Sequence, residues 1–446
     1  MTSTKPRRLP RVLGFFDVSV LSSASMGPAY SLAATTGPMV AAAGAAAPLA
    51  LGAMTAIMLC IAVSYAMLSR VAPNAGSAYS WVRESFGPYA GAYAAWLLLL
   101  SNFFATLATA VPVGFYTLAL VAPAHEADPR WSAVVGAIWI AGSAILLYAG
   151  IRPTAAVTLV ALLVEMAVLA ASAIASSFLP PPHAAAAHAS AVPVTFAGVL
   201  AAMTLAVWMV DGWELSAATS EEVAGDARAS GRGGITGLLV TAAVLGLCMV
   251  AYLHAGGVAG LAAHQTDALA YVGDRLGGEA WRVAIVVTVL TSSLSALWTT
   301  ILYLSRSVYA MGRDGVLARA FGGLDDRNEP RWALVAVAAV ATLFELLTGF
   351  SSSAADQLTL VLDGSALFLG LLFGVSALAC VRRFLRVRGA LLAGVVVPLA
   401  GASLLLAVLG LSVVTESAQL RSYALVGVLS GLIFALWRGR PAAEAG

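Results

Sequence analysis

Residues 16–36 read FDVSVLSSASMGPAYSLAATT, an apolar segment with a helix-breaking pair near its centre. Pro28 has no backbone N–H, and its ring clashes with the carbonyl four residues earlier, while Gly27 loosens the backbone just before it. Inside a membrane, interrupted backbone is tolerated only where it is buried in protein or lines a cavity. The segment therefore predicts a membrane span that is broken at Gly27–Pro28 and lines a cavity there.

The composition indicates a polytopic protein that is embedded in a lipid bilayer. The 446 residues are 60% hydrophobic and only 10% charged, whereas soluble domains carry about 25% charged residues. The net charge of +2 gives no sign of a nucleic-acid partner. The histidines lack metal-ligand spacing, and the spans contain no nucleotide-binding loop or clustered catalytic motif. We therefore expect no metal, no cofactor and no enzymatic activity.

A run of about 20 apolar residues is long enough to cross a bilayer. The chain contains twelve such runs, which we number as spans one to twelve. They lie at residues 14–36, 40–68, 89–121, 132–149, 154–178, 194–224, 235–257, 281–310, 332–349, 357–380, 390–414 and 422–437. The predicted fold class is an all-α polytopic membrane protein with 12 transmembrane helices in one transmembrane domain, residues 1–446.

The distribution of Lys and Arg predicts the orientation, because basic residues accumulate in cytoplasmic loops. With both termini inside, 20 of the 24 Lys and Arg residues fall in inner segments. The remaining four, Arg130, Arg275, Arg282 and Arg421, fall outside. We therefore predict a multi-pass protein of the cell inner (cytoplasmic) membrane with both termini cytoplasmic.

A second interruption lies in span six, where residues 208–214 read WMVDGWE. Spans one and six are equivalent if the first ten spans form two halves of five, and halves with an odd number of spans are inverted relative to each other. The predicted repeats are residues 14–178 and 194–380, followed by two additional helices at residues 390–437. Interrupted spans at matching positions indicate a transport site between inverted repeats.

Three stretches resemble motifs of the amino acid–polyamine–organocation (APC) superfamily of permeases. Residues 70–82, RVAPNAGSAYSWV, and 86–88, FGP, are similar to its P-x-x-G-x-x-Y-x-W and F-G-P patterns. Residues 305–315, SRSVYAMGRDG, resemble its S-R-x-x-Y-x-M-x-R-D-G loop, and 212–214, GWE, with 220–222, SEE, resemble its G-F-E and S-E-E. The resemblance covers most of the chain. It implies a secondary amino acid permease that works by alternating access.

The half-helix after Pro28 should begin with free amides and the positive end of a helix dipole, which together suit an anion. Pro28 cannot donate, so we predict that the amides of Gly27, Ala29 and Tyr30 bind a substrate carboxylate. The side chain of Tyr30 either covers that carboxylate or packs between spans. The resemblance implies the same arrangement for an α-amino acid.

The opposite side of the predicted substrate site suits an ammonium group. It consists of carbonyls that end the first half-helix, near Ser25, and of carbonyls at Trp208 and Asp211. Gly212 completes the site at the second break. The hydroxyls at residues 22–23 are equally well explained by hydrogen bonds within their own helix.

Aromatic side chains flank the second break. The resemblance places Trp208 at a substrate-lining or gating position. Trp213 is equally well explained as a packed or interfacial tryptophan.

Carboxylates at membrane depth are costly and indicate function. Asp211 lies at the break and has a substrate or proton role, or else caps a helix. It stands where such permeases usually have an apolar or small residue. Glu214 is expected to be structural and Asp363 to make a contact between helices, while Glu345 is expected to reach water near an outer end.

Glu165 lies near the middle of span five, with no basic residue close in sequence. The resemblance implies that proton-coupled relatives carry a titratable lysine at about this place. Glu165 is therefore either a proton carrier or a protonated acid that holds helices together.

The sequence as a whole predicts a secondary active transporter of amino acids, with the proton as coupling ion. The alternatives are an amine or polyamine transporter, which Asp211 as a counter-ion would favour, and an amino acid exchanger. In the inner loops, Arg306 and Arg313 either pair with Glu221, Glu222 or Asp314 to latch the inward gate, or they form a solvated face.

Overall fold

The protein is described by a computed structural model that covers residues 8–126, 128–182, 192–265, 268–350, 354–415 and 418–439. The described residues form helices, and their only strand-like pairing is a bridge between Leu13 and Val223. The main helices are α1 (Phe15–Ser25), α2 (Pro28–Ala43), α3 (Ala47–Val71), α4 (Ser77–Phe86), α5 (Pro88–Val121), α6 (Pro129–Tyr148), α7 (Ile151–Ser177), α9 (Phe196–Met209), α10 (Leu215–Ala218), α11 (Ala229–Ala263), α12 (Ala268–Gly277), α13 (Glu279–Arg313), α14 (Arg331–Thr348), α15 (Ala354–Phe384), α16 (Val397–Thr415) and α17 (Ala418–Arg438).

The all-α fold class is confirmed, and the helices have the length and composition of membrane spans. Nine helical stretches of the described residues are long and apolar enough to cross a bilayer, and two shorter apolar helices are Phe196–Met209 and Leu425–Arg438. The first of the nine, Phe15–Val71, contains α1, α2 and α3. The number of twelve crossings and the repeat architecture stay predictions.

Both predicted breaks are present. α1 ends at Ser25 and α2 begins at Pro28, with Gly27 between them in the left-handed region at φ 52°. α9 ends at Met209, and Gly212 follows with φ 99° before α10 begins. Glycine adopts such positive φ values without strain, so the chain can stop and restart its helical path at these two residues.

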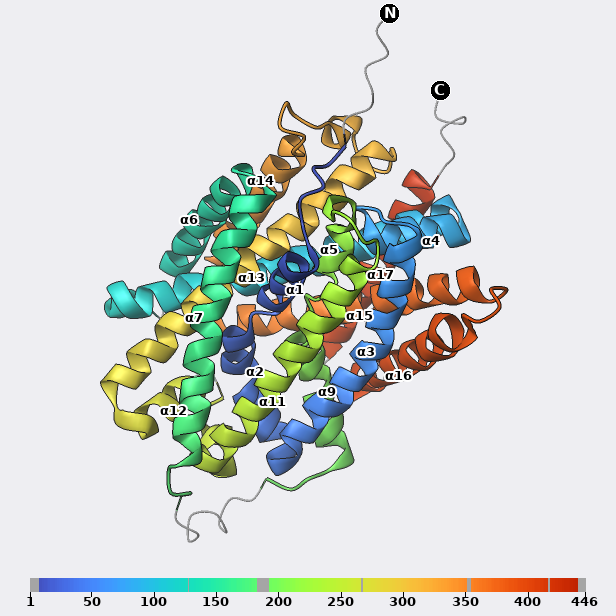
Figure 1. Cartoon of the computed structure of the whole chain (residues 1–446). Helices are drawn as coiled ribbons and strands as arrows, with labels where there is room; N and C mark the ends of the chain where they lie inside the picture. The colour runs from blue at the N-terminus through green and yellow to red at the C-terminus, as the bar shows by residue number, and fades with distance from the viewer. Residues whose placement is uncertain are drawn as a thin grey trace, which may run out of the picture.

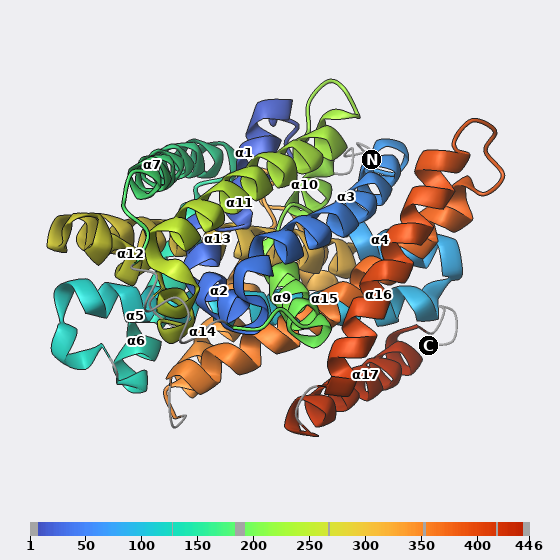
Figure 2. The ribbon, with the colours of Figure 1, turned by 90° about the horizontal axis from the view of Figure 1, so that it is seen from below.

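The two broken segments lie together inside the bundle. α1 and α2 pack against α11, and α2 also packs against α9. Figure 2 shows α16 and α17 at one edge of the bundle. α16 packs on α3 and α15, and α17 packs on α5. The breaks are thereby buried in protein, as a membrane interior requires.

The segment before α1 and the C-terminal end of α17 lie at one end of the bundle, which we call the terminal end, and α12 lies at the other, the far end (Figure 1). α4 and α12 are two short helices that the search for spans missed. Each contains charged residues, such as Arg83 in α4 and Arg275 in α12, which removes it from the apolar runs.

Candidate functional site

A small cavity with a volume of about 30 Å³ lies between the two breaks. Space of that size holds one or two water molecules. It is lined by Ser25, Met26, Tyr30, Ser101, Asn102, Ala105, Thr109, Trp208, Asp211, Gly212, Glu214, Ala296, Thr300, Tyr303, Ser365 and Leu369. Five of the sequence-predicted substrate residues therefore come together, namely Ser25, Tyr30, Trp208, Asp211 and Gly212. Gly27 and Ala29 do not line it.

Two acidic side chains face this cavity from the second break. The Glu214 carboxylate accepts a hydrogen bond from the Gly212 amide, at 2.9 Å from Oε2. Its partner is thus backbone of its own break, which fits the structural role that we expected. The Asp211 carboxylate makes no hydrogen bond within the part of the chain that the structure describes, and it is close enough to Glu214 to be repelled by it. Asp211 is therefore the acidic group that remains available to a ligand.

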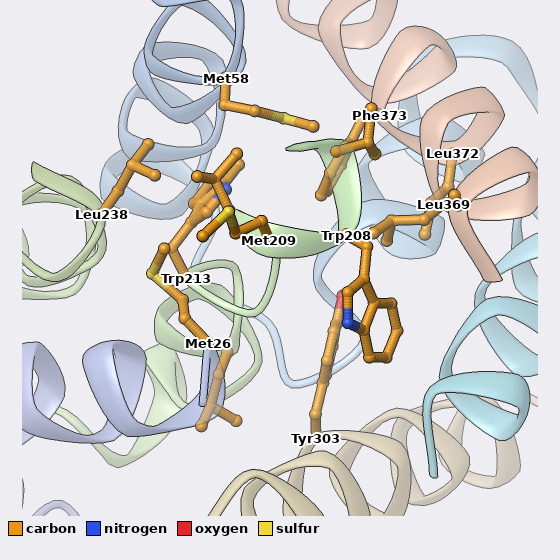
Figure 3. Close-up of a cluster of buried hydrophobic side chains, with 14 of the residues drawn as sticks. Met26, Met58, Trp208, Met209, Trp213, Leu238, Tyr303, Leu369, Leu372 and Phe373 are labelled. Atoms are coloured by element: carbon orange, nitrogen blue, oxygen red, sulfur yellow. The ribbon is translucent and has the colours of Figure 1, made fainter. Parts of the chain in front are cut away.

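The two tryptophans of the second break lie in different surroundings. Trp208 lines the cavity with Tyr303, and its ring packs edge-on to Tyr30 with centroids 6.4 Å apart. Trp213 lies on the other side of the break, where it stacks on Phe373 at 5.5 Å (Figure 3). Trp213 is thus a packed side chain, and Trp208 is the tryptophan that a ligand can meet.

The amides predicted to bind a substrate carboxylate are engaged within the protein. The Ala29 N–H donates to Glu165 Oε1 at 2.6 Å, and the Tyr30 N–H donates to Ser292 Oγ at 3.1 Å. The Gly27 N–H donates to the Ala24 carbonyl at 3.0 Å. The prediction of three free amides at this terminus is therefore wrong for this conformation, because side chains from distant helices occupy two of them.

The Glu165 side chain extends from α7 to the N-terminus of α2. Its Oε1 also accepts from the Ser292 hydroxyl at 2.5 Å, so one carboxylate oxygen joins α7, α2 and α13. The side chain is fully buried, and Oε2 has no hydrogen-bond partner among the described residues. A carboxylate is favourable at a helix N-terminus, which compensates for the missing basic partner. Oε2 is the atom left to take up a proton.

Tyr30 is bonded to α5 at the point where Pro112 interrupts the backbone hydrogen bonds of that helix. Pro112 lies inside α5 and has no N–H, so the carbonyl of Ala108 has no helical donor. The Tyr30 hydroxyl donates to that carbonyl at 2.5 Å. Tyr30 thus packs between helices, which is one of the two alternatives that the sequence left open, and it also lines the cavity.

The serines of residues 22–23 do not line the cavity. The Ser23 hydroxyl donates to the Gly237 carbonyl of α11 at 3.4 Å, and the Ser22 hydroxyl has no partner in the described part of the chain. Neither hydroxyl forms the bond within its own helix that we had considered.

A buried ion cluster lies at the terminal end, and we call it the latch and define it as Arg306, Glu222 and Glu329. Arg306 is 2% exposed, and it contacts Glu222 at 2.8 Å and Glu329 at 2.7 Å. Glu329 Oε1 also accepts from the amide of Ile151, at the start of α7. The latch therefore joins α13, the segment after α10, the loop before α14 and α7.

A half-exposed set of contacts surrounds the latch. Arg313 pairs with Glu221 at 3.0 Å, and Tyr79 donates to Asp314 at 2.6 Å. The backbone of residues 12–13 donates to the Glu222 carbonyl, which ties the chain before α1 to the same place. The pairing of Arg306 and Arg313 with acidic residues is confirmed.

The far end is more open. A cavity with a volume of about 660 Å³ is lined by Phe115, Tyr116, Glu126, Arg282 and others, and it reaches Ala33 and Val289. Those two residues lie about one helical turn beyond Tyr30 and Ser292. The far-end cavity thus approaches the small cavity from the side opposite the latch.

Residues 13–428 match the amino acid permease family. The chain belongs to this family. The branched-chain amino acid permease BcaP of Lactococcus lactis subsp. cremoris (strain MG1363) is similar, with 27% identity over 311 residues. The match covers 64% of this chain and 65% of BcaP. The resemblance to APC permeases is thereby confirmed, and the coarser statement of a multi-pass membrane transport protein follows from it.

The sequence analysis missed three residues of this permease: Asn102 and Tyr303, which line the cavity, and Ser292, which does not line it but bonds to Glu165. Ser292 lies in α13 and joins Glu165 and Tyr30. Asn102 is the single amide side chain in α5 and lines the cavity. A lone amide in a long apolar helix is a signal that could have been used.

Glu345 of this permease does not reach water, which corrects the expectation. It is fully buried in α14, and neither of its carboxylate oxygens has a partner among the described residues. A Cβ atom on Gly136 of α6 would lie 2.3 Å from Glu345 Oε1, so the glycine makes room for the carboxyl group. The side chain of Asp363 lies outside the described residues.

Replacing Gly212 with Ala should destabilise this permease by about 1–3 kcal/mol. The new Cβ would lie 2.7 Å from the Ser25 carbonyl oxygen, and the positive φ is strained for alanine. Thermal unfolding in detergent measures the effect. Gly246→Ala is the matched control, because it lies within α11 and its Cβ would meet nothing within 4 Å. Equal unfolding temperatures for the two variants would contradict the close approach of the two breaks.

Proposed function

We propose that this permease moves amino acids across the cytoplasmic membrane by alternating access, as a proton-coupled secondary transporter. Membership of the amino acid permease family supports amino acid transport. The name of BcaP specifies branched-chain amino acids, and extending that substrate class to this chain is part of the proposal.

Alternating access needs a central site that opens to one side at a time. The small cavity lies at the meeting point of two broken helices, where a ligand meets polar backbone and side chains inside the bundle. The latch closes the terminal end, while the larger cavity approaches from the far end. With the terminal end cytoplasmic, as the charge count predicts, this conformation faces outward.

The observation that carries the proton-coupling proposal is the position of Glu165. One oxygen of its carboxyl group bonds to the start of α2 and to α13, and the other is unpartnered in the described part of the chain. Uptake of a proton would neutralise the carboxylate and weaken its bond to the Ala29 amide. The half-helix that borders the substrate cavity would then be free to shift, which links proton binding to the transport cycle.

The proposal includes the topology. Twelve spans, repeats at residues 14–178 and 194–380 and additional helices at 390–437 are consistent with breaks at matching positions. Both termini lie in the cytoplasm in this proposal. It requires three partners: a small amino acid or amine, the proton as coupling ion, and the lipid bilayer.

Uptake into proteoliposomes tests the proposed function. Purified protein is supplied with a panel of radiolabelled amino acids, with and without a pH gradient that is acid outside. We expect at least one amino acid to accumulate above its external concentration only with the gradient, and a protonophore to abolish the excess. Uptake that instead depends on amino acid loaded inside would identify an exchanger and contradict proton coupling.

A further inference from the structure

Another cavity lies at the terminal end, beside the latch, and we call it the terminal cavity. Its volume is about 310 Å³, which falls within the range of small-molecule sites, about 300–1,000 Å³. The segment before α1, the loop after α3, the segment after α10 and α13 meet around it. Its lining residues are Arg8, Leu9, Arg11, Pro73, Glu221, Tyr309 and Arg313.

The charges that line the terminal cavity do not balance. Arg8, Arg11 and Arg313 contribute three guanidinium groups, whereas Glu221 contributes the one carboxylate among the lining residues. That carboxylate is already engaged. Both of its oxygens accept from Arg313, at 3.0 and 3.1 Å, and Oε1 also accepts from the Ala75 amide at 2.9 Å. Arg313 and Glu221 thus compensate each other, and the excess positive charge comes from Arg8 and Arg11.

These two arginines have no partner within the described part of the protein. Both are exposed, and no hydrogen bond, ion pair or ring contact joins the side chain of Arg8 or Arg11 to a described residue. Like charges on the wall of one cavity repel each other, and an anion bound between them would relieve the repulsion. Two unpaired positive charges match a phosphate monoester, which carries a charge of about −1.5 to −2 at neutral pH.

The chain that carries the two arginines is fixed against the latch. The amides of residues 12–13 donate to the Glu222 carbonyl at 2.9 and 3.0 Å. Leu9, which lies between the arginines in the sequence, is only 4% exposed and anchors this chain in the protein. The backbone of the arginines is therefore in position before a ligand arrives, which lowers the entropy cost of binding.

The remaining walls of the terminal cavity are apolar. Leu9, Pro73 and the ring of Tyr309 line it, and the Arg313 guanidinium lies over that ring, 5.2 Å from its centroid. Carbon atoms of a ligand can pack against these side chains while its phosphate meets the unpaired arginines. Guanidinium groups bind phosphate oxygens through paired N–H donors. The cavity is therefore chemically suited to an organic phosphate.

We infer that the terminal cavity binds a phosphate monoester, either free in solution or as the headgroup of a membrane lipid, with Arg8 and Arg11 as its partners. Basic pockets between helices on the cytoplasmic side of a membrane bind lipid headgroups, and the proposed topology places the terminal end on that side. The bound anion joins the segment before α1 to α13 beside the latch, and it stabilises this conformation by binding to it. The site is separate from the cavity between the breaks and does not depend on the proposed substrate or its coupling.

Two probes with the same phosphate group distinguish its source. Glycerol 3-phosphate is the free monoester, and dihexanoylphosphatidic acid carries the same group on two short acyl chains. The unfolding temperature of the purified wild-type protein in detergent is measured with rising concentrations of each probe, at neutral pH and constant ionic strength. Dihexanoylphosphatidylcholine, which has no net charge, is the control for the acyl chains.

We expect a saturable rise in unfolding temperature with at least one phosphate monoester and none with the phosphatidylcholine. The rise should be about 3 °C at a probe concentration about a hundred times Kd. A rise with glycerol 3-phosphate identifies a site for a free anion. A rise with the phosphatidic acid alone identifies a site for a lipid headgroup.

The double variant Arg8→Gln/Arg11→Gln tests the assigned arginines. It should weaken binding of the probe by about tenfold or more, which moves the midpoint of the titration to higher concentration. Arg386→Gln/Arg388→Gln is the matched control, because it removes the same charge from two exposed arginines that do not line the terminal cavity. It should leave the midpoint unchanged.

Four results would overturn the inference. They are no rise with either phosphate monoester, a rise with phosphatidylcholine that equals the rise with phosphatidic acid when glycerol 3-phosphate has no effect, an unchanged midpoint in Arg8→Gln/Arg11→Gln, and an equal shift in the control variant. Failure of Arg8→Gln/Arg11→Gln to fold would likewise contradict the absence of partners on which the inference rests. Amino acid uptake plays no part in these measurements, so each of these results leaves the proposed function standing.

Discussion

Glu165→Gln should abolish pH-gradient-driven accumulation of substrate in proteoliposomes while leaving exchange of substrate between the two sides. Glutamine keeps an oxygen that can accept the Ala29 N–H, so the bonds that join α7 to α2 can persist. It cannot take up or release a proton. The variant should therefore still carry substrate through the cycle, but without a link between the proton gradient and net movement.

Two assays on the same preparation separate these effects. Accumulation is measured with an inward proton gradient, and exchange is measured as uptake of labelled substrate into liposomes that contain unlabelled substrate. Glu84→Gln is the matched control, because Glu84 is 47% exposed and pairs only with Arg383 at 3.4 Å among the described residues. Accumulation by Glu165→Gln at the wild-type level would refute a proton-carrying role and leave Glu165 as a structural acid.

Arg306→Met should destabilise the protein by about 3–5 kcal/mol, because removing one member of a buried ion cluster leaves its partners uncompensated. Glu222 is fully buried and Glu329 is nearly so, and each contacts the Arg306 guanidinium within 2.8 Å. Methionine fills a similar volume but cannot balance two carboxylates. The unfolding temperature in detergent should fall accordingly, and the terminal end should become accessible to proteases.

A matched variant and a rescue make this test specific. Arg313→Met removes an arginine that is 33% exposed and should cost only about 1 kcal/mol. Adding Glu222→Gln and Glu329→Gln to Arg306→Met should recover part of the lost stability, since the uncompensated charges are then gone. Equal losses of stability in the two arginine variants, or no recovery of stability in the triple variant, would contradict the prediction. Either result would show that uncompensated buried charge does not cause the loss of stability in Arg306→Met.

The fold follows closely from local features of the sequence. Long apolar runs must form helices in a membrane, because every backbone polar group has to be satisfied within its own segment. The breaks at Gly27–Pro28 and Gly212 were predictable for the same reason, since proline and glycine act on their own backbone. The helices α4 and α12 were missed because a search for apolar runs does not detect short amphipathic segments.

The candidate site was predictable only in part. Ser25, Tyr30, Trp208, Asp211 and Gly212 were found because each lies at a break, and a break has to line a cavity. The sequence could not predict that the amides of Ala29 and Tyr30 donate to side chains of other helices. Glu165 is 136 residues from Ala29 along the chain, and Ser292 is 262 residues from Tyr30.

By itself, the sequence determined the membrane class, the two breaks and the permease motifs, all of which depend on short-range chemistry. Only the tertiary structure decided which groups meet across those breaks. It brought Glu165 to the start of α2, stacked Trp213 against Phe373 and buried Glu345 behind Gly136. These contacts join helices far apart in the chain, and they depend on how side chains from several helices share the interior, which no local pattern records.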